Sequence, residues 1–358
     1  MVRLDRQKLL SDLSQLKPAV TRTDTFAQSS CLCFVGDRVV AMGGKNNNDQ
    51  LTVACSLPSP LAGEVSGAVP ARKLYELLAA MRCEEVRISQ ANGHLTVQPG
   101  EKKKGEREAA RIDVSMEVEL PVHLLPSPTE WKLLDSAFCD ALEFISEFGK
   151  GKKGATATYV HMVHLHPDYL EAIDGVQCAR WPLRNDITSC VCLTEDILPA
   201  ARLKVKECAE NDRWVSFRNS EGLVYSCRKE EAADYPNLDG VLHVEGTKVV
   251  FPKGLTESVS IGEVFAKIDD THNNLLLHLH PGKFTLTGYG PQGEYTREVD
   301  GDYDGPEVEV YVNATRLKGL ADRHSECVVS ESKLRVDTQD YHYVSVLVPR
   351  SALDGEQK

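Results

Sequence analysis

The stretch that decides the fold is Val310–Asp337, VYVNATRLKGLADRHSECVVSESKLRVD. It begins with alternating apolar residues, as in a strand, and Asn313 stands where its side chain can cap a following helix. After the helix come two alternating runs, ECVVS and KLRVD, around a polar turn, which is the pattern of a β-hairpin. The stretch therefore predicts a strand, a helix and a hairpin in succession.

The same succession of elements occurs twice more in the chain. Ala68–Gln98 and Val191–Cys227 each contain an apolar strand, a helix and a hairpin, with Pro70 and Thr194 at the start of their helices. Proline suits the first helical turn, and threonine suits an N-cap position. Recurrence at intervals of about 120 residues indicates that one structural unit is repeated three times.

Each repeat also contains an earlier helix, predicted from apolar residues at three- and four-residue steps. These helices are Leu4–Leu16, Thr129–Ile145 and Ser260–Asp270. Short strand-like runs with polar turns separate the two helices of each repeat. The predicted fold class is therefore α+β, with three repeated domains that each contain two helices and antiparallel sheets. The predicted domains are residues 1–116, 117–243 and 244–358.

Just before the third repeat, Asp300–Gly305 reads DGDYDG, like the start of a calcium-binding loop. An EF-hand requires a bidentate glutamate at position twelve, which here is Tyr311, and a strand is predicted where a helix should follow. An acidic turn is the favoured interpretation, and a calcium site of another kind is the alternative. No metal ion or other cofactor is predicted.

The composition is that of a globular protein, with 358 residues, 42% hydrophobic and 26% charged. No run of eighteen apolar residues is present, and the N-terminal segment Met1–Lys17 is charged and amphipathic. A cytoplasmic protein is therefore expected. The net charge of −12 argues against a simple nucleic-acid binder, unless positive charge is segregated on one surface.

The eleven cysteines are placed mostly in apolar runs. Cys31 and Cys33, and likewise Cys190 and Cys192, are two residues apart, so each pair shares one face of a predicted strand. This spacing favours buried, reduced thiols over a zinc knuckle.

Four stretches carry a resemblance that extends over nearly the whole chain. They are Val69–Leu78 (VPARKLYELL), Ala233–Leu242 (ADYPNLDGVL), Tyr303–Leu320 (YDGPEVEVYVNATRLKGL) and Val344–Arg350 (VSVLVPR). In this order, and with the threefold repeat, the chain resembles the bacterial DNA polymerase III beta subunit, the sliding clamp. The region Thr21–Asn48 matches poorly, which indicates a divergent member.

The resemblance implies three DNA-clamp domains per chain and a head-to-tail homodimer that closes a six-domain ring around duplex DNA. Such a protein is a processivity factor in DNA replication. It is the non-catalytic subunit of the polymerase, and it tethers the polymerase and the clamp loader through their short linear peptides. It carries no cofactor.

The resemblance also assigns positive residues to the DNA. The second helix of each repeat, the N-terminal helix and the basic loop Phe148–Ala155 would face the phosphates, in contacts that are independent of base sequence. The helices Thr129–Ile145 and Ser260–Asp270 are net acidic, which weakens this assignment there. The predicted DNA-binding residues are Arg3, Arg6, Lys17, Arg22, Arg72, Lys73, Arg82, Lys150, Lys152, Lys153, Arg202, Lys204, Lys206, Arg316 and Lys318.

Clamps bind partner peptides in an apolar cleft between the second and third domains, where an extended segment with apolar anchors can dock. After Asp174 and Gly175 the family usually has His-Arg-Leu, whereas this chain has Val-Gln-Cys, so the preferred peptide stays open. The predicted partner-peptide pocket consists of Leu170, Asp174, Gly175, Pro236, Val241, Val346, Leu347, Val348 and Pro349.

Two alternatives remain open at this stage. A metal-dependent enzyme could use two groups of strand histidines, which are expected near sheet edges and mostly exposed. No nucleotide-binding or hydrolase motif accompanies them. The other alternative is a clamp fold used as a decoy or binding module for replication proteins. The histidines are His161, His164 and His166, and His278 and His280.

Overall fold

The computed structural model describes residues 1–44, 51–101, 108–151, 157–266 and 273–351. The chain divides into two compact units. The first consists of Met1–Glu147, Met162–Leu170 and Leu183–Asp234, and the second of Phe148–His161, Glu171–Pro182 and Tyr235–Lys358. The division into three domains at residues 116 and 243 stays a prediction.

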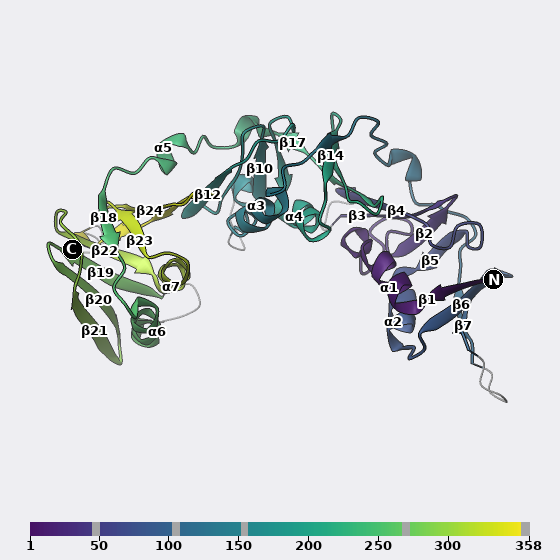
Figure 1. Ribbon diagram of the computed structural model, residues 1–358, viewed down its shortest axis with the longest axis horizontal. Helices are drawn as coiled ribbons and strands as arrows, with labels where there is room; N and C mark the ends of the chain where they lie inside the picture. The colour runs from purple at the N-terminus through teal and green to yellow at the C-terminus, as the bar shows by residue number, and fades with distance from the viewer. Residues whose placement is uncertain (45–50, 102–107, 152–156, 267–272, 352–358) are drawn as a thin grey trace. The chain divides into compact units, whose positions relative to one another are not determined.

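A four-stranded antiparallel sheet, in the order β1-β6-β7-β8, belongs to the first unit. Helices α1 (Arg6–Ser14) and α2 (Ala71–Ala80) lie side by side next to it (Figure 1). Their buried residues, among them Leu9, Leu13 and Leu74, recur at helical spacing, so each helix has one apolar face. The strands are β1 (Val2–Asp5), β6 (Glu85–Ala91), β7 (His94–Pro99) and β8 (Ala110–Asp113).

An eight-stranded sheet in the same unit has the order β5-β2-β3-β4-β16-β15-β14-β9. Strands β4 and β16 pair antiparallel, with Ser56 opposite Val224, so the first and second repeats share this sheet. The strands are β2 (Cys31–Val35), β3 (Arg38–Gly43), β4 (Val53–Pro58), β5 (Gly67–Pro70), β9 (Lys132–Leu133), β14 (Glu207–Glu210), β15 (Trp214–Arg218) and β16 (Val224–Arg228).

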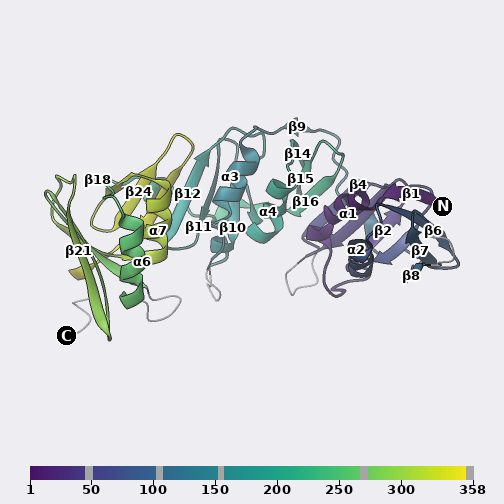
Figure 2. The same cartoon turned by 60° about the horizontal axis from the view of Figure 1, so that its bottom comes forward.

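The remaining elements of the first unit include helices α3 (Phe138–Ile145) and α4 (Thr194–Arg202), which pack against each other (Figure 2). Strands β10 and β13 pair antiparallel, as do β13 and β17. The bounds are β10 (Met162–His166), β13 (Cys190–Leu193) and β17 (Glu230–Glu231), with 3₁₀ turns at Lys17–Ala19, Val122–Leu124 and Ala232–Asp234.

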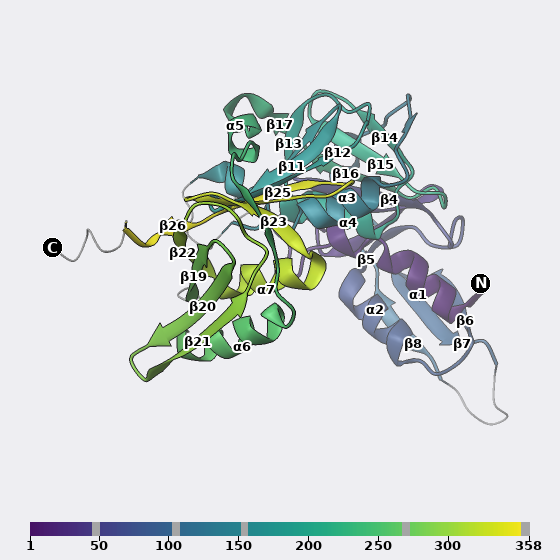
Figure 3. The same ribbon diagram turned by 60° about the vertical axis from the view of Figure 1, so that its left-hand side comes forward.

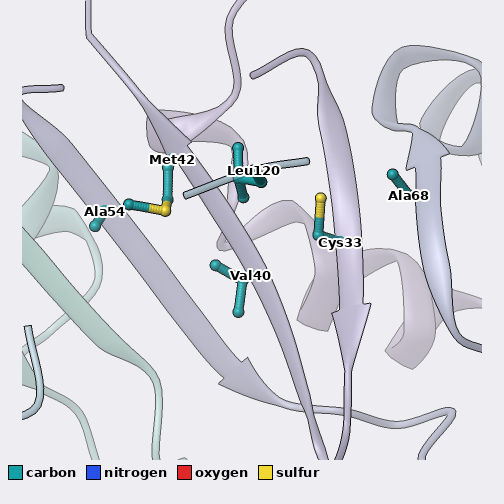
Figure 4. Close-up of a cluster of buried hydrophobic side chains, with 6 residues drawn as sticks. All are labelled: Cys33, Val40, Met42, Ala54, Ala68 and Leu120. Carbon is teal, nitrogen blue, oxygen red and sulfur yellow. The ribbon is translucent and has the colours of Figure 1, made fainter. Parts of the chain in front are cut away.

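One core cluster of the first unit lies on strands β2 to β5, and Leu120 from the segment after β8 completes it (Figure 4). Gln28, whose φ of 60° is unusual for a residue with a side chain, fixes this segment. Its Nε2 donates to the Glu117 carbonyl at 2.8 Å, and its Oε1 accepts from the Glu119 amide at 2.9 Å. The cluster contains Cys33, Val40, Met42, Ala54, Ala68 and Leu120.

The second unit contains a five-stranded antiparallel sheet in the order β21-β20-β19-β22-β26, next to which α6 (Leu255–Ala266) and α7 (Ala314–Arg323) lie side by side (Figures 2 and 3). Its other strands pair in the order β12-β25-β24-β23-β18. The bounds are β12 (Gln177–Pro182), β18 (Thr247–Val250), β19 (Asn274–His280), β20 (Lys283–Gly290), β21 (Gly293–Asp300), β22 (Val308–Asn313), β23 (Glu326–Val329), β24 (Lys333–Asp337), β25 (His342–Val346) and β26 (Val348–Pro349). Strand β11 (Tyr169–Ile173) straddles the division, and a 3₁₀ turn spans Thr158–His161.

Glycines bring α6 unusually close to β20. A Cβ atom on Gly288 would lie 2.1 Å from the carbonyl oxygen of Gly262, in the middle of α6. A Cβ on Gly290 would lie 2.3 Å from the carbonyl oxygen of Phe265. The helix can therefore rest on the sheet only because these strand positions have no side chain.

Much of the predicted local structure is confirmed. The three hairpins are present as β6–β7, β15–β16 and β23–β24. Asn313 caps α7, since its side chain accepts from the Arg316 amide. The stretch after Asp300 leads into β22, as the strand interpretation required, and no helix begins there.

Several helix predictions are wrong in detail. Helix α6 begins at Leu255, before the predicted start at Ser260, and Leu4 lies in β1 rather than in the first helix. The helix predicted for Thr129–Ile145 begins only at Phe138, because Lys132–Leu133 pairs with β14 and Asp135 accepts from the Ala137 amide in a turn. Thr194 is the first residue of α4 rather than its cap. Its buried hydroxyl finds no hydrogen-bond partner in the part of the chain that the structure describes.

The cysteines lie where their spacing predicted. All eleven are free thiols, and Cys31 and Cys33 lie on β2 while Cys190 and Cys192 lie on β13. Burial raises the pKa of Cys33 to about 12, so this thiol stays protonated and packs as a small apolar side chain. Among the described residues, no helix is both long and apolar enough to cross a membrane.

Candidate functional site

Lys333, at the start of β24, joins two residues of the predicted partner-peptide pocket. In the ladder between β24 and β25 it stands directly opposite Val346. Its Nζ donates to the carbonyl oxygens of Gly240 and Val241, at 3.3 and 3.4 Å. One lysine thus contacts the Val241 backbone and stands opposite Val346 in the sheet, although these two valines are 105 positions apart in the sequence.

The Asp174–Gly175 turn lies beside β25, the strand that ends with Val346. The Asp174 carboxylate accepts from the amides of Val176 and Gln177, at 3.0 and 2.9 Å. Gly175 has a φ of +92°, which a residue with a side chain rarely adopts. The Val346 amide donates to the Val176 carbonyl at 2.9 Å, so this turn is fixed against the end of β25.

The short helix α5 (Asp239–Leu242) covers an apolar cluster in the second unit. Leu238 and Leu242 are buried, and Val241 is half-buried against the same cluster. The cluster also receives Cys178 from β12 and Val344 from β25. Pro236, in the approach to α5, is half-buried as well. The linker around α5 is thus held by apolar contacts on one side and is open on the other.

The C-terminal strand leaves apolar side chains exposed next to this helix. Val346 is 44% exposed and Val348 is 39% exposed, whereas Leu347 between them is buried. Val348 and Pro349 form β26, which pairs with Tyr311 and Val310 at the edge of the five-stranded sheet. An edge strand with exposed valines can accept an extended peptide that has apolar anchors.

The structure fixes the Asp174–Gly175 turn to Val346 through the Val176 carbonyl, and Lys333 connects the Val241 backbone to the strand opposite Val346. Val348 and Pro349 pair with β22 instead, so the pocket as a whole stays a prediction. Leu347 is buried, and Leu170 is a fully buried residue of the first unit. Sequence reasoning missed Lys333 and Arg180, the two cations that hold α5. A lone cation in a strand gives no signal in the sequence for such a contact.

Several residues predicted to bind DNA already have partners in the protein. Arg3 pairs with Glu85, and Arg72 pairs with Glu76 at 2.7 Å on α2. The Arg6 side chain is half-buried and donates to two carbonyl oxygens, that of Leu78 in the last turn of α2 and that of Cys83 just after the helix, both at 2.8 Å. These contacts occupy Arg6 in joining α1 to α2.

The other cations of that group lie on both units. Lys17 is exposed with its Nζ 4.9 Å above the Tyr75 ring, and Arg316 and Lys318 of α7 are half-buried. Lys152 and Lys153 lie outside the described residues. Those that are exposed are Arg22, Lys73, Arg82, Lys150, Arg202, Lys204 and Lys206.

The histidine strands do not lie at sheet edges, and that prediction was wrong. Strand β10 has β13 and β11 as neighbours, and β19 lies between β20 and β22. His164 is 7% exposed, with Nε2 2.9 Å from the Ser189 hydroxyl, and His278 Nε2 is 2.8 Å from Glu307. Within the described ranges, no three His, Cys, Asp or Glu side chains form a group that could hold a metal ion.

Comparison in sequence gives no relative, since no protein-family model matches the chain and no curated protein matches it. Comparison in structure gives many. The DNA polymerase III subunit beta of Pseudomonas aeruginosa is 17% identical, with 97% of this chain and 99% of that one covered and a TM-score of 0.76. The beta subunit of Thermotoga maritima is 16% identical, with 97% and 98% covered and a TM-score of 0.74.

A further structure of the Pseudomonas aeruginosa sliding clamp, described as bound to griselimycin, is 18% identical, with 97% and 98% of the two chains covered and a TM-score of 0.77. Coverage this complete leaves no large part of either chain outside the shared architecture. Identities this low show a common fold and do not transfer a function. The chain has the fold of the bacterial DNA polymerase III beta subunit, the sliding clamp, and the resemblance found in its sequence is confirmed.

Proposed function

We propose that this protein is a DNA sliding clamp, a non-catalytic processivity factor for a replicative DNA polymerase in the cytoplasm. The observation that carries the proposal is the clamp fold over 97% of the chain, together with surfaces that suit ring closure and peptide capture. Fold alone does not fix function, so each surface is considered in turn.

Ring closure would join two copies head to tail. The first unit ends one sheet with β8, and the second unit ends another with β21, so each presents an edge strand that another chain can pair with. Next to β21, α6 exposes Ile261 (40%) and Val264 (75%), a small apolar surface on an otherwise packed helix. A heterologous contact repeated twice gives a closed dimer when the rotation is right.

Both edge strands carry charge of either sign. The exposed Arg111 and Asp113 lie on β8, and the exposed Glu294 and Glu298 lie on β21 with Arg297 between them. Arg111 can therefore pair with a carboxylate of β21. The proposed dimer is head to tail because β8 and β21 are different edges.

Contact with duplex DNA would come from exposed cations on α2, in the segment after α4 and at Lys150. Such contacts neutralise phosphates without reading bases, so the ring can slide. With a net charge of −12, the rest of the surface would repel DNA. Partner proteins would bind through short peptides at Val241, Val346 and Val348. A Pseudomonas aeruginosa sliding clamp is described as bound to griselimycin, and we propose griselimycin as a ligand of this chain too.

The mechanism is topological. A closed ring keeps the polymerase near the primer end, so rebinding becomes intramolecular and its effective concentration rises. Opening the ring would be the work of an ATP-driven loader. Neither step requires a catalytic residue in this chain.

The first experiment measures the mass in solution by light scattering over a dilution series, for the wild type and for Val264→Asp. The wild type is expected at twice 39.6 kDa and the variant at a lower mass, because the charge would be buried in both interfaces. Leu133→Asp is the matched control, since Leu133 is 79% exposed on β9, away from the proposed interface. A wild-type monomer at all concentrations, with no retention on nicked circular DNA after loading, would refute the proposal.

A further inference from the structure

We propose that Lys333 and Arg180 act as positioning residues for the partner-peptide pocket, by fixing α5 in the orientation in which Val241 lines it. The inference rests on the proposed function and adds to it the device that sets the affinity of the pocket. It concerns four residues that are distant in sequence, Glu171, Arg180, Asp239 and Lys333, all in the second unit.

The first contact holds the C-terminal half of α5. Lys333 Nζ donates to the carbonyl oxygens of Gly240 and Val241, which a helix leaves without partners in its last turn. A cation at this end of a helix also interacts favourably with its dipole. Since Lys333 stands opposite Val346 in the β24–β25 ladder, its hydrogen bonds connect α5 to the strand pair that carries Val346.

The second contact holds the N-terminal half of α5. Arg180 on β12 donates from Nη1 to the Asp239 carboxylate at 2.7 Å and from Nε to the Glu171 carboxylate at 2.8 Å. The Glu171 side chain is only 2% exposed and that of Asp239 is 68% exposed. The buried Glu171 carboxylate thus fixes the Arg180 guanidinium, which also bonds to the exposed Asp239 carboxylate of α5.

A helix of four residues needs such contacts. Helices this short are not stable by themselves. Leu238, the residue before α5, offers no side-chain cap, and the Asn237 side chain accepts from the Asp239 amide alone at 2.8 Å. Leu238 and Leu242 attach α5 to the sheet, but apolar contacts are non-directional and do not fix its rotation. The hydrogen bonds from Lys333 and Arg180 fix the rotation, and Val241 is thereby held half-buried against the cluster, with the rest of its side chain open to a ligand.

The affinity for a ligand depends on the fraction of molecules in which α5 has the orientation that binds it. A ligand that needs Val241 in place binds with an apparent dissociation constant equal to the intrinsic one divided by the populated fraction of that state. Removing one hydrogen bond that selects this state is expected to weaken binding about fivefold. The effect should appear in ligand affinity and in local exchange of α5, with little change in overall stability.

The experiment titrates griselimycin by calorimetry into the full-length protein and into the variants Lys333→Met and Asp239→Asn. Both variants should bind about fivefold more weakly, whereas Lys333→Arg and Asp239→Glu, which keep the contacts, should bind within about twofold of the wild type. Lys248→Met is the matched control, since Lys248 lies on β18 and its ion pair is with Glu326 on β23 rather than with α5. Hydrogen exchange of the Val241 and Leu242 amides, which bond to the Leu238 carbonyl, should be faster only in Lys333→Met and Asp239→Asn.

Equal affinity of Lys333→Met and the wild type would overturn the inference, and so would equal losses in Lys333→Met and Lys333→Arg. Failure of the wild type to bind griselimycin would overturn it too, because the predicted difference in affinity between wild type and variants could not then exist. Failure of the proposed function is recognised separately, from dimer mass and retention on circular DNA, neither of which uses griselimycin.

Discussion

Gly288→Ala tests the close contact of α6 with β20. In the structure, the new Cβ would lie 2.1 Å from the oxygen, 2.6 Å from the carbon and 2.7 Å from the Cα of Gly262. Ordinary contacts with a Cβ begin near 3.4 Å, and the obstructing atoms are backbone, so no rotamer change can relieve the clash. The helix must move away from the sheet by more than an ångström.

Overpacking of this kind costs about 1–3 kcal/mol, and an obstruction by backbone places Gly288→Ala near the upper value. The matched control is Gly319→Ala on α7, where an added Cβ meets nothing within 4 Å. That variant should be more stable by up to about 1 kcal/mol, because alanine is the better helix former.

Urea unfolding, followed by circular dichroism, measures both changes in the free energy of unfolding. Because α6 carries Ile261 and Val264, Gly288→Ala should also weaken the dimer in light scattering, whereas Gly319→Ala should not. An unfolding midpoint of Gly288→Ala equal to that of the wild type would refute the reasoning, since it would show that α6 does not rest on β20 as described.

Two further predictions concern titration and thiol chemistry. Burial and the neighbouring Arg323 lower the pKa of His324, whose Nε2 lies 2.9 Å from the Tyr341 hydroxyl. As the pH falls below 6.5, His324 is therefore protonated in the unfolded chain before it is protonated in the folded one. The wild type should lose stability over this pH range relative to His324→Gln. Urea midpoints of the two proteins that shift in parallel between pH 7.5 and 5.5 would contradict this. Iodoacetamide at pH 8 should label the half-buried Cys31, Cys83 and Cys139 before the buried thiols, because burial raises the pKa of Cys178 and Cys208 to about 12. Mass spectrometry of the digested protein checks the order, and early labelling of Cys178 would show that α5 leaves its cluster.

The sequence predicted those elements that depend on neighbours in the chain. The hairpin Glu85–Pro99 follows from alternation around Asn92 and Gly93, both of which have positive φ. The cap at Asn313 follows from one side chain and the helix after it. The threefold repetition then indicated the fold, because three units with the same order of elements are expected to form three similar domains.

Long-range pairing was not predictable in the same way. Lys132 and Leu133 belong to a helical pattern by spacing, but the free edge of β14 takes them as a strand. The histidine strands alternate as edge strands do, and only the order of the sheet shows that they are internal. The contacts of Lys333 and Arg180 with α5 depend on the register of β24 and β12, which no local pattern encodes.

The pairing of β4 with β16 has a mechanical consequence. Four residue pairs, from Val53–Cys227 to Ser56–Val224, hydrogen-bond the first repeat to the second within one continuous sheet. A protease that cut the connecting segment between β8 and β9 would leave two fragments that still adhere, and a pulling force would have to shear this ladder before the repeats separated. If the protein forms a ring, the interface between these two repeats is accordingly not where the ring separates most easily.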